Sequence, residues 1–279
     1  MSRSLILIAS YPKSGNTWVR LILDTLRRDA PVSINDIAVG LYGLERRQLF
    51  DMLAPAEASE LLAGEIENLL PDFYAAVAAD GGHILKVHDR LRKTPDGRWL
   101  FPPECVKSVI YVVRHPFDVA VSYANHRGFS VAEAVALMAN ADSVIPPDAG
   151  ESSVVVERPG TWSGNVASWL QGAPYPVTVV RYEDLYADPE REILRLADAA
   201  CLSVTAASLA RTIESTGFAR LQAEETAKGF REHSARSPAF FRKGRPGSWA
   251  EGLDDSSREK LLRDHAETMS RLEYKAERS

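Results

Sequence analysis

The chain has 279 residues, of which 45% are hydrophobic and 25% charged, and its formal net charge is −5 with a pI near 5.8. This composition is typical of a globular protein with a sizeable core, and the length suits one large domain or two small ones. The acidic balance argues against general nucleic-acid binding, which uses a basic domain or stripe. Any anion site must therefore be a local group of cations.

The cysteines and the apolar runs bear on where the protein resides. Cys105 and Cys201 lie far apart without a CxxC spacing, so we expect buried free thiols and neither a disulfide nor a zinc site. The apolar run at residues 5–9 is too short for a signal-peptide core, and no later stretch approaches the ~18 apolar residues of a membrane span. We therefore expect a cytoplasmic protein with no membrane span.

Apolar runs and helical patterns alternate along the chain. LILIA at residues 5–9, the turn-rich SYPKSGN and the periodic TWVRLILDTLRR predict a strand, a loop and a helix. Residues 30–80 carry helical patterns and predict helices that flank a pocket. Runs rich in Val and Ile at residues 83–88, 107–113 and 176–182 predict further strands. Such continuous apolar strands suit a parallel sheet covered on both faces, so we expect an α/β fold.

Two segments interrupt this alternation. Residues 142–161 and 219–247 lack regular periodicity. We predict both as long loops, which are often functional in compact domains.

The first strand, loop and helix form the strongest local signal. A turn that leads onto a helix N-terminus offers unpaired backbone N–H groups to an anion. Gly15 lets the backbone approach a ligand closely, Lys13 supplies a cation, and Thr17 supplies a hydroxyl. The lysine precedes the glycine, so the Walker A order is absent and an ordinary ATPase is disfavoured. A Pro-Gly turn with a surface lysine is the alternative, and this segment alone does not decide between the two.

Three segments together resemble a known family. YPKSGNTW at residues 11–18 resembles the 5′-phosphosulfate loop of the sulfotransferases that use 3′-phosphoadenosine 5′-phosphosulfate (PAPS). RHPFDVAVSY at 114–123 is similar to that family's 3′-phosphate segment, and RKGRPGSW at 242–249 to its RKGxxGDW element. Asn16 stands where animal enzymes commonly have Thr, and Ser248 where Asp is common. KSGNTW looks more like the family's bacterial members.

The resemblance implies a fold and a reaction. The expected fold is a P-loop-like central parallel sheet with helices on both faces, forming one sulfotransferase domain over residues 1–279. The expected enzyme is a PAPS-dependent O-sulfotransferase, which moves a sulfuryl group from PAPS to a hydroxyl of a small-molecule acceptor.

PAPS is anionic at both ends of its adenosine, so its site needs two sets of cations. The resemblance assigns the 5′-phosphosulfate to one loop, which comprises Lys13, Ser14, Gly15, Asn16 and Thr17. It assigns the 3′-phosphate to residues of two later segments, namely Arg114, Ser122, Arg242, Lys243 and Gly244. Positions that border the adenosine in the family are matched by Trp18, Tyr182, Thr216 and Phe218.

Some of these assignments have a structural alternative. Arg114 instead forms an ion pair with Asp118 in one of them. In another, the basic turn at 242–243 is simply solvated. For Trp18 and Phe218 the alternative is core packing.

His88 is the candidate general base. It ends the run LKVH, and the resemblance to the family's KxH element puts Lys86 and His88 on one strand face. A histidine with a pKa near neutrality suits proton abstraction. Lys13 then meets the charge that grows on the bridging oxygen, and Lys86 helps to neutralise the sulfuryl oxygens. No metal-ligand set is visible in the sequence, so we expect no metal.

Two other functions stay open. One is a P-loop-type nucleotide or small-molecule kinase, against which stand the missing Walker A order and the second phosphate site at Arg114 and Ser122. The other is a silent nucleotide-binding module, against which stands the presence of both Lys13 and His88.

The acceptor is only loosely specified. We expect it to be recognised by residues 30–80 and 142–161. TWSGNVASWL at 161–170 resembles bacterial enzymes that sulfate secondary metabolites such as glycopeptides. Glycan, phenol and lipid acceptors stay open, as does the oligomeric state.

Overall fold

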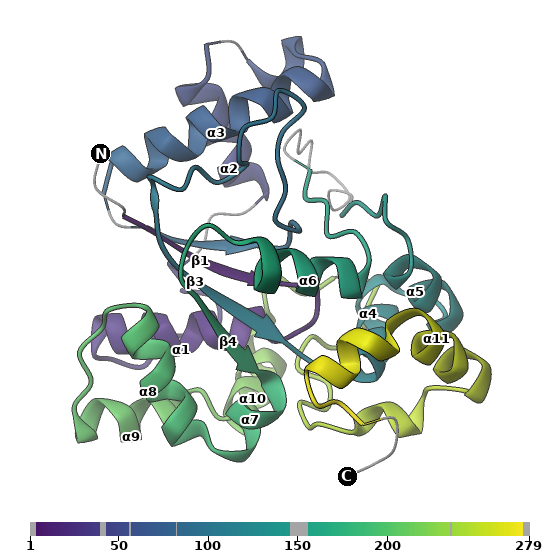
Figure 1. The fold of residues 1–279 in the computed structure, drawn as a ribbon. Coiled ribbons are helices and arrows are strands. Elements are labelled where there is room, and N and C mark those ends of the chain that lie inside the picture. The colour runs from purple at the N-terminus through teal and green to yellow at the C-terminus, as the bar shows by residue number, and fades with distance from the viewer. Residues whose placement is uncertain are drawn as a thin grey trace.

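The computed structural model describes residues 4–39, 43–55, 57–81, 83–145, 156–234 and 236–275. At its centre is a four-stranded sheet with the spatial order β2-β1-β3-β4, in which all neighbouring strands are parallel (Figure 1). The strands are β1 (Leu5–Ser10), β2 (Ile84–Val87), β3 (Val106–Val113) and β4 (Val177–Arg181). They coincide with the four apolar runs, so the predicted parallel sheet is confirmed.

The side chains of β1 enter two separate cores. Leu5 and Leu7 belong to one cluster of buried residues, and Ile6 and Ile8 belong to the other. Successive strand residues point to opposite faces of a sheet, so a strand covered on both faces is apolar at every position. The polar residue that β1 does carry, Ser10, lies at its carboxyl end.

Helices cover both faces of the sheet, as expected (Figure 1). The core that contains Ile6 is closed by α1 (Asn16–Arg28), α7 (Tyr182–Ala187), α8 (Pro189–Ala199), α9 (Ala206–Ser215) and α10 (Phe218–Lys228). The core that contains Leu5 is closed by α2 (Gly43–Leu53), α3 (Ala63–Ala79), α4 (Pro116–Arg127), α5 (Val131–Met138), α6 (Trp162–Gly172) and α11 (Asp255–Arg271). Two short 3₁₀ helices are η1 (Ala58–Glu60) and η2 (Ser248–Glu251).

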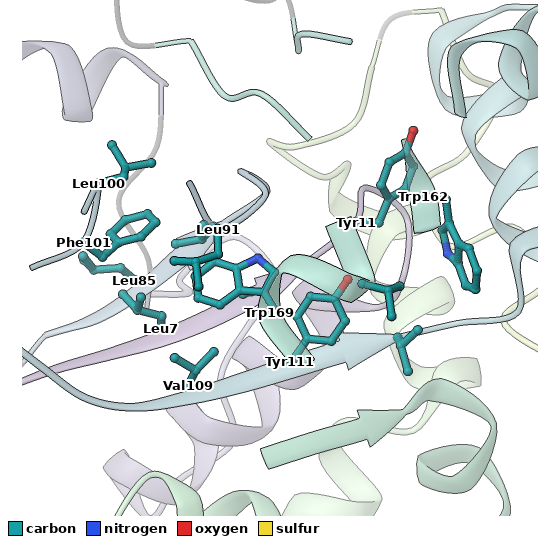
Figure 2. Packing of buried hydrophobic residues seen from close by; sticks show 14 of the residues in the cluster. Leu7, Tyr11, Leu85, Leu91, Leu100, Phe101, Val109, Tyr111, Trp162 and Trp169 are labelled. Carbon is teal, nitrogen blue, oxygen red and sulfur yellow. The ribbon is translucent and has the colours of Figure 1, made fainter. Parts of the chain in front are cut away.

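Aromatic rings fill the core between the sheet and α6. Trp169 of α6 lies between Phe101 and Tyr111 (Figure 2), with ring centroids 6.1 and 6.4 Å away. Trp169 has no exposed surface. Rings of this size contribute much of the apolar area buried in a core, so they hold α6 firmly on the sheet.

One predicted loop was wrong in its first part. Within residues 219–247, which we expected to be irregular, α10 extends to Lys228. Its only buried residue is Leu221, so it shows no apolar stripe, although Ala, Gln, Glu and Lys are good helix formers. The helix also holds the later part of the segment, because Glu225 accepts hydrogen bonds from the N–H groups of Phe240 and Phe241 at 2.7 and 2.8 Å.

The other predicted loop is partly described. Ile145 and Glu157 form an isolated antiparallel bridge, and the residues between 146 and 155 lie outside the described part. Both cysteines are free. Cys105 is buried as expected, but Cys201 is exposed, because it turns to the surface with φ 54° after the buried Ala200. Within the described ranges, we find no helix with the length and apolarity needed to cross a membrane.

Candidate active site

The loop between β1 and α1 brings a lysine and backbone N–H groups to the carboxyl end of the sheet. Lys13 and Gly15 have positive φ angles, 66° and 105°, so the chain turns sharply before α1. The N–H groups of Trp18 and Val19 donate to the carbonyl of Gly15, which leaves the preceding N–H groups outside the helical ladder. Such groups suit an anion. The buried hydroxyl of Ser14 has no hydrogen-bond partner among the described residues.

Gly15 is required by its surroundings. A Cβ atom at this position would lie 2.6 Å from Cδ2 of Tyr182, and a φ of 105° disfavours other residues. We expected Gly15 to admit a ligand. In the structure, the position where a side chain of residue 15 would begin faces the Tyr182 ring.

The side chains of Asn16 and Thr17 are engaged within the protein. Asn16 Nδ2 donates to the carbonyl of Ile8 at 3.0 Å and to Ser10 Oγ at 3.1 Å, so it braces the loop against β1. The Thr17 hydroxyl donates to Glu232 Oε2 at 3.4 Å. What these two residues offer to an anion is therefore their backbone N–H.

Lys13 lies in a poorly solvated place. Its Nζ is 4.0 Å from the centre of the Phe240 ring. Burial, with a smaller effect from the charge of Lys86, lowers the pKa of Lys13 to about 7, against the opposing effect of Glu232. The structure thus brings Lys13 and Lys86 close together, and an anion bound beside them would favour their charged forms.

The imidazole of His88 is held by the end of β1. Its Nδ1 is 2.9 Å from the carbonyl oxygen of Ser10 and 3.2 Å from Ser10 Oγ. A carbonyl oxygen can only accept, so Nδ1 carries the proton and Nε2 carries the lone pair. Burial, followed by the charge of Lys86, lowers the pKa of His88 to about 3, well below the neutral value that we expected from the sequence. His88 is therefore neutral, in the tautomer of a proton acceptor.

The backbone around His88 is fixed by the segment that follows the 142–161 loop. Asn165 Nδ2 donates to the carbonyl of His88 at 3.2 Å, and Trp169 Nε1 donates to the carbonyl of Asp89 at 3.0 Å. Glu157 accepts the His88 N–H at 2.8 Å. Asn165 and Trp169 have no exposed surface. Helix α6 thus supplies two side chains that support the backbone at His88 and Asp89, and Glu157 supplies a third from the segment that we expected to recognise the acceptor.

A second group of cations lies around Tyr182. The guanidinium carbon of Arg114 is 4.2 Å from the centre of the Tyr182 ring, and the Tyr182 hydroxyl donates to the carbonyl of Gly244 at 2.5 Å. Arg114 is buried, and its Nε has no hydrogen-bond partner in the described part of the chain. Burial and the charge of Arg114 lower the pKa of Arg242, so the two guanidinium groups lie near each other. Ser122 is half-buried on α4.

The segment 242–249 is attached to α4 by one carboxylate. Asp118 accepts hydrogen bonds from the N–H groups of Gly247 and Trp249 at 2.8 and 2.9 Å and from the Ser248 hydroxyl at 3.1 Å. Among the described contacts, Asp118 is paired with this segment, and the alternative ion pair with Arg114 is not formed. Ser248 thus donates one of the hydrogen bonds that attach this segment to Asp118.

Gly244 and Lys243 take different directions within that segment. A Cβ atom on Gly244 would lie 2.0 Å from Cδ2 of Phe218, so the backbone passes directly over this ring. Lys243 forms an ion pair with Glu251. Phe218 also packs against Phe241, with ring centroids 6.2 Å apart. The structure therefore gives Phe218 both a core contact and a place beside the predicted phosphate segment.

Trp18 contacts both Thr216 and Tyr182. Trp18 Nε1 donates to the carbonyl of Thr216 at 2.9 Å, and the rings of Trp18 and Tyr182 meet edge to face with centroids 5.3 Å apart. Predicted site residues from three distant segments therefore meet around Tyr182, in the contacts of Gly15 and Trp18, of Arg114 and of Gly244.

Other residues near this site were missed from the sequence. Ser10 and Glu157 both hold His88, but neither carries a local signal, because each is about seventy or more residues away from it. His126 was also missed. Burial and nearby lysines lower the pKa of His126 to about 2, so this ring lies near Lys13 and Lys86. A usable signal existed, since His126 is four residues after Ser122 and on the same helix face.

Comparison with known proteins gives consistent results. The family described as "Sulfotransferase domain" matches residues 3–273, which is nearly the whole chain. Among individual proteins, Sulfotransferase 1A1 of the dog is 28% identical over 272 residues, covering 95% of this chain and 83% of that protein. Mouse Sulfotransferase 1 family member D1 is 26% identical over 290 residues, covering 98% and 86%.

Two solved structures share the fold. A mouse sulfotransferase in complex with PAP has a TM-score of 0.58 at 17% identity, covering 95% of this chain and 85% of that one. A retinol dehydratase in complex with retinol and PAP has a TM-score of 0.59 at 17% identity, covering 96% and 82%. The α/β architecture is therefore shared with both.

Proposed function

Because this chain belongs to the sulfotransferase domain family, we propose that it transfers a sulfuryl group from PAPS to a hydroxyl of a small-molecule acceptor. The observation that carries the proposal is the contact of one ring, that of Tyr182, with both Gly15 of the first loop and Arg114 of the second cation group. PAPS has anionic groups at both ends of an adenosine, and two linked cation groups match such a donor. PAP in two proteins of similar fold supports the same nucleotide.

The polar atoms without partners fit this donor. Ser14 Oγ and Arg114 Nε are buried and have no hydrogen-bond partner among the described residues, and buried polar groups are normally paired. We assign the 5′-phosphosulfate to Lys13, Ser14 and the N–H groups of residues 15–17. We assign the 3′-phosphate to Arg114, with Ser122 and with residues 242–244.

The adenosine lies beside Tyr182 in this proposal. Its other neighbours are Trp18, Thr216 and Phe218. Trp18 contacts Tyr182 and Thr216, and Phe218 contacts Gly244, so these residues hold that side of the site together.

His88 acts as the general base. When bound, PAPS supplies the activated sulfuryl group. His88 Nε2 accepts the proton of the acceptor hydroxyl, while the carbonyl of Ser10 keeps Nδ1 protonated and stabilises the imidazolium that results. The low pKa of His88 reflects burial and the neighbouring lysines, and a bound anion offsets the effect of these lysines. Lys13 stabilises charge on the departing phosphate oxygen, and Lys86 lies near enough to act on the sulfuryl oxygens.

Family membership favours this reaction over the kinase alternative. The finer proposal is that the chain belongs to the bacterial branch, works in the cytoplasm and modifies a secondary metabolite such as a glycopeptide. The branch rests on KSGNTW, and the acceptor rests on the resemblance of residues 161–170.

The experiment is a screen of hydroxylated metabolites with PAPS, in which a product is recognised by the mass gain of one sulfuryl group. With an acceptor in hand, His88→Ala should lower turnover by about two to four orders of magnitude and leave the affinity for PAP unchanged. His83→Ala is the matched control, since His83 precedes β2 and is 38% exposed at its side chain. Near-normal turnover in His88→Ala would remove His88 from the mechanism, and PAP binding without turnover of any acceptor would favour a silent binding module.

A further inference from the structure

Two buried tyrosine hydroxyls near the active site have no partner. Tyr11 and Tyr123 are 1% and 2% exposed, and within the described ranges neither hydroxyl has a hydrogen-bond partner. Their rings meet edge to face, with centroids 6.3 Å apart. In Figure 2 the hydroxyl of Tyr11 points away from Trp169 and the aromatic row of the core. A buried polar group without a hydrogen bond destabilises the folded state, so a pair of them suggests that something else binds there.

A third polar atom without a partner lies on the same helix. His126 follows Tyr123 by three residues on α4, so both side chains lie on one face of the helix. His126 Nδ1 is buried and has no hydrogen-bond partner in the described structure. The His126 ring meets Phe240 edge to face with ring centroids 6.0 Å apart, and the ammonium group of Lys13 also contacts the Phe240 ring.

The three atoms belong to the surroundings of the transfer centre. The charges of Lys13 and Lys86 act on His126, and both also act on His88. The charge of Glu157 acts on Tyr123, and the same carboxylate accepts the His88 N–H.

Their chemistry defines a class of ligand. A tyrosine hydroxyl donates and accepts, and a neutral imidazole does both through its two nitrogens. Hydroxyl groups of a ligand are complementary to both, whereas a hydrocarbon surface would leave all three atoms unpaired and dry. Phe240, beside His126, offers an apolar ring face to the carbon skeleton of such a ligand.

From this arrangement we propose that the acceptor is a polyhydroxylated molecule of the sugar type, whose reacting hydroxyl faces His88 while neighbouring hydroxyls bind Tyr11, Tyr123 and His126. This inference rests on the proposed sulfuryl transfer. It makes these three side chains specificity determinants, and it disfavours flat phenols and sterols as acceptors, because a site built to bind hydroxyl groups rejects analogues that lack them.

The experiment compares methyl glycosides of the common hexoses, and their monodeoxy analogues, with 4-nitrophenol. Turnover is measured with PAPS, and binding to the PAP complex is measured by ligand-detected NMR. We expect at least one glycoside to bind and to exceed 4-nitrophenol in kcat/KM by about tenfold or more, and removal of one contacting hydroxyl to cost about tenfold. That cost should disappear in Tyr123→Phe or in His126→Phe.

Tyr175→Phe is the matched control. The Tyr175 hydroxyl is buried but donates to the carbonyl of Phe101 at 3.3 Å, so its loss should lower the melting temperature without changing acceptor preference. Tyr123→Phe removes a hydroxyl without a partner, so its melting temperature should stay equal to that of the unmodified protein or rise.

The outcomes distinguish the sugar-type acceptor from the proposed sulfuryl transfer. If 4-nitrophenol is turned over as well as every glycoside, or no glycoside binds the PAP complex, the sugar-type acceptor is overturned while sulfuryl transfer stands. The same conclusion follows if Tyr123→Phe and His126→Phe both keep the full penalty for the deoxy analogue, or if Tyr123→Phe is destabilised as much as Tyr175→Phe. Absence of PAP binding together with absence of any turnover would instead overturn the proposed function.

Discussion

Replacing Asn165 with alanine tests how the fold positions the candidate base. The Asn165 side chain accepts from the Tyr111 hydroxyl at 2.8 Å and donates to the carbonyls of His88 and Pro159 at 3.2 and 3.0 Å. Asn165→Ala leaves three buried partners unpaired, and each such group costs about 1–3 kcal/mol. Even the low end of that range gives a loss of about 3 kcal/mol in the free energy of unfolding.

Turnover should fall as well. The carbonyl of His88 is released, and a shift of about 1 Å in a catalytic group costs up to about a hundredfold in rate, so we expect kcat to fall by about ten- to a hundredfold. The affinity for PAP should not change, because Asn165 touches none of the residues assigned to the nucleotide.

Tyr111→Phe is the matched control. It removes the hydroxyl that donates to Asn165 Oδ1 but keeps the contacts of Asn165 with the carbonyls of His88 and Pro159. About 1 kcal/mol of stability should therefore be lost, with kcat nearly unchanged. Urea unfolding measures the first quantity, and sulfation of an acceptor from the screen measures the second. Equal losses of kcat in both variants, or normal kcat in Asn165→Ala, would refute a positioning role.

Three further predictions concern the donor site. The pKa of Lys13 is lowered to about 7, mainly by burial, so the free protein loses this cation as the pH rises through neutrality. The affinity of the unmodified protein for PAP should therefore fall between about pH 6 and about pH 8 relative to that of Lys13→Arg, whose charge persists, and calorimetry should show proton uptake on binding. Parallel pH profiles of the two proteins would contradict this. Arg114→Ala should cut the preference for PAP over adenosine 5′-monophosphate by about ten- to a hundredfold, with Arg114→Lys intermediate, and an unchanged preference would move the 3′-phosphate site elsewhere. Gly15→Ala should lose about 2 kcal/mol or more of stability and weaken PAP binding, because its Cβ meets Tyr182, whereas Gly172→Ala, with open space around it, should do neither; similar melting temperatures would count against this explanation.

The sheet was predictable because its signal is local. Each strand is covered on both faces, and the resulting run of apolar residues stands out in the sequence. The same criterion failed for α10, which buries Leu221 alone and is held by polar contacts such as those of Glu225 with residues 240 and 241. Apolar periodicity cannot detect a helix of this kind.

The candidate site also has a part that could be predicted from the sequence and a part that could not. The loop at 11–17 could be recognised because its lysine, glycine and helix start are contiguous. The supports of His88 could not, because Asn165 and Ser10 are 77 and 78 positions away in the sequence and reach it only in the folded chain. Polar residues such as these carry no periodic signal, and only the pairing of the sheet with α6 determines what they contact.

The shared contacts of Tyr182 have a consequence for which lengths of ligand the site accepts. Its ring is rigid, it touches the position of Gly15 and the guanidinium of Arg114, and its hydroxyl is bound to the carbonyl of Gly244. The ring therefore sets the spacing between the first loop and Arg114 in this structure. A ligand with two anionic groups must have a matching length to contact both cation groups, so Tyr182 makes the site selective for nucleotide length as well as for charge.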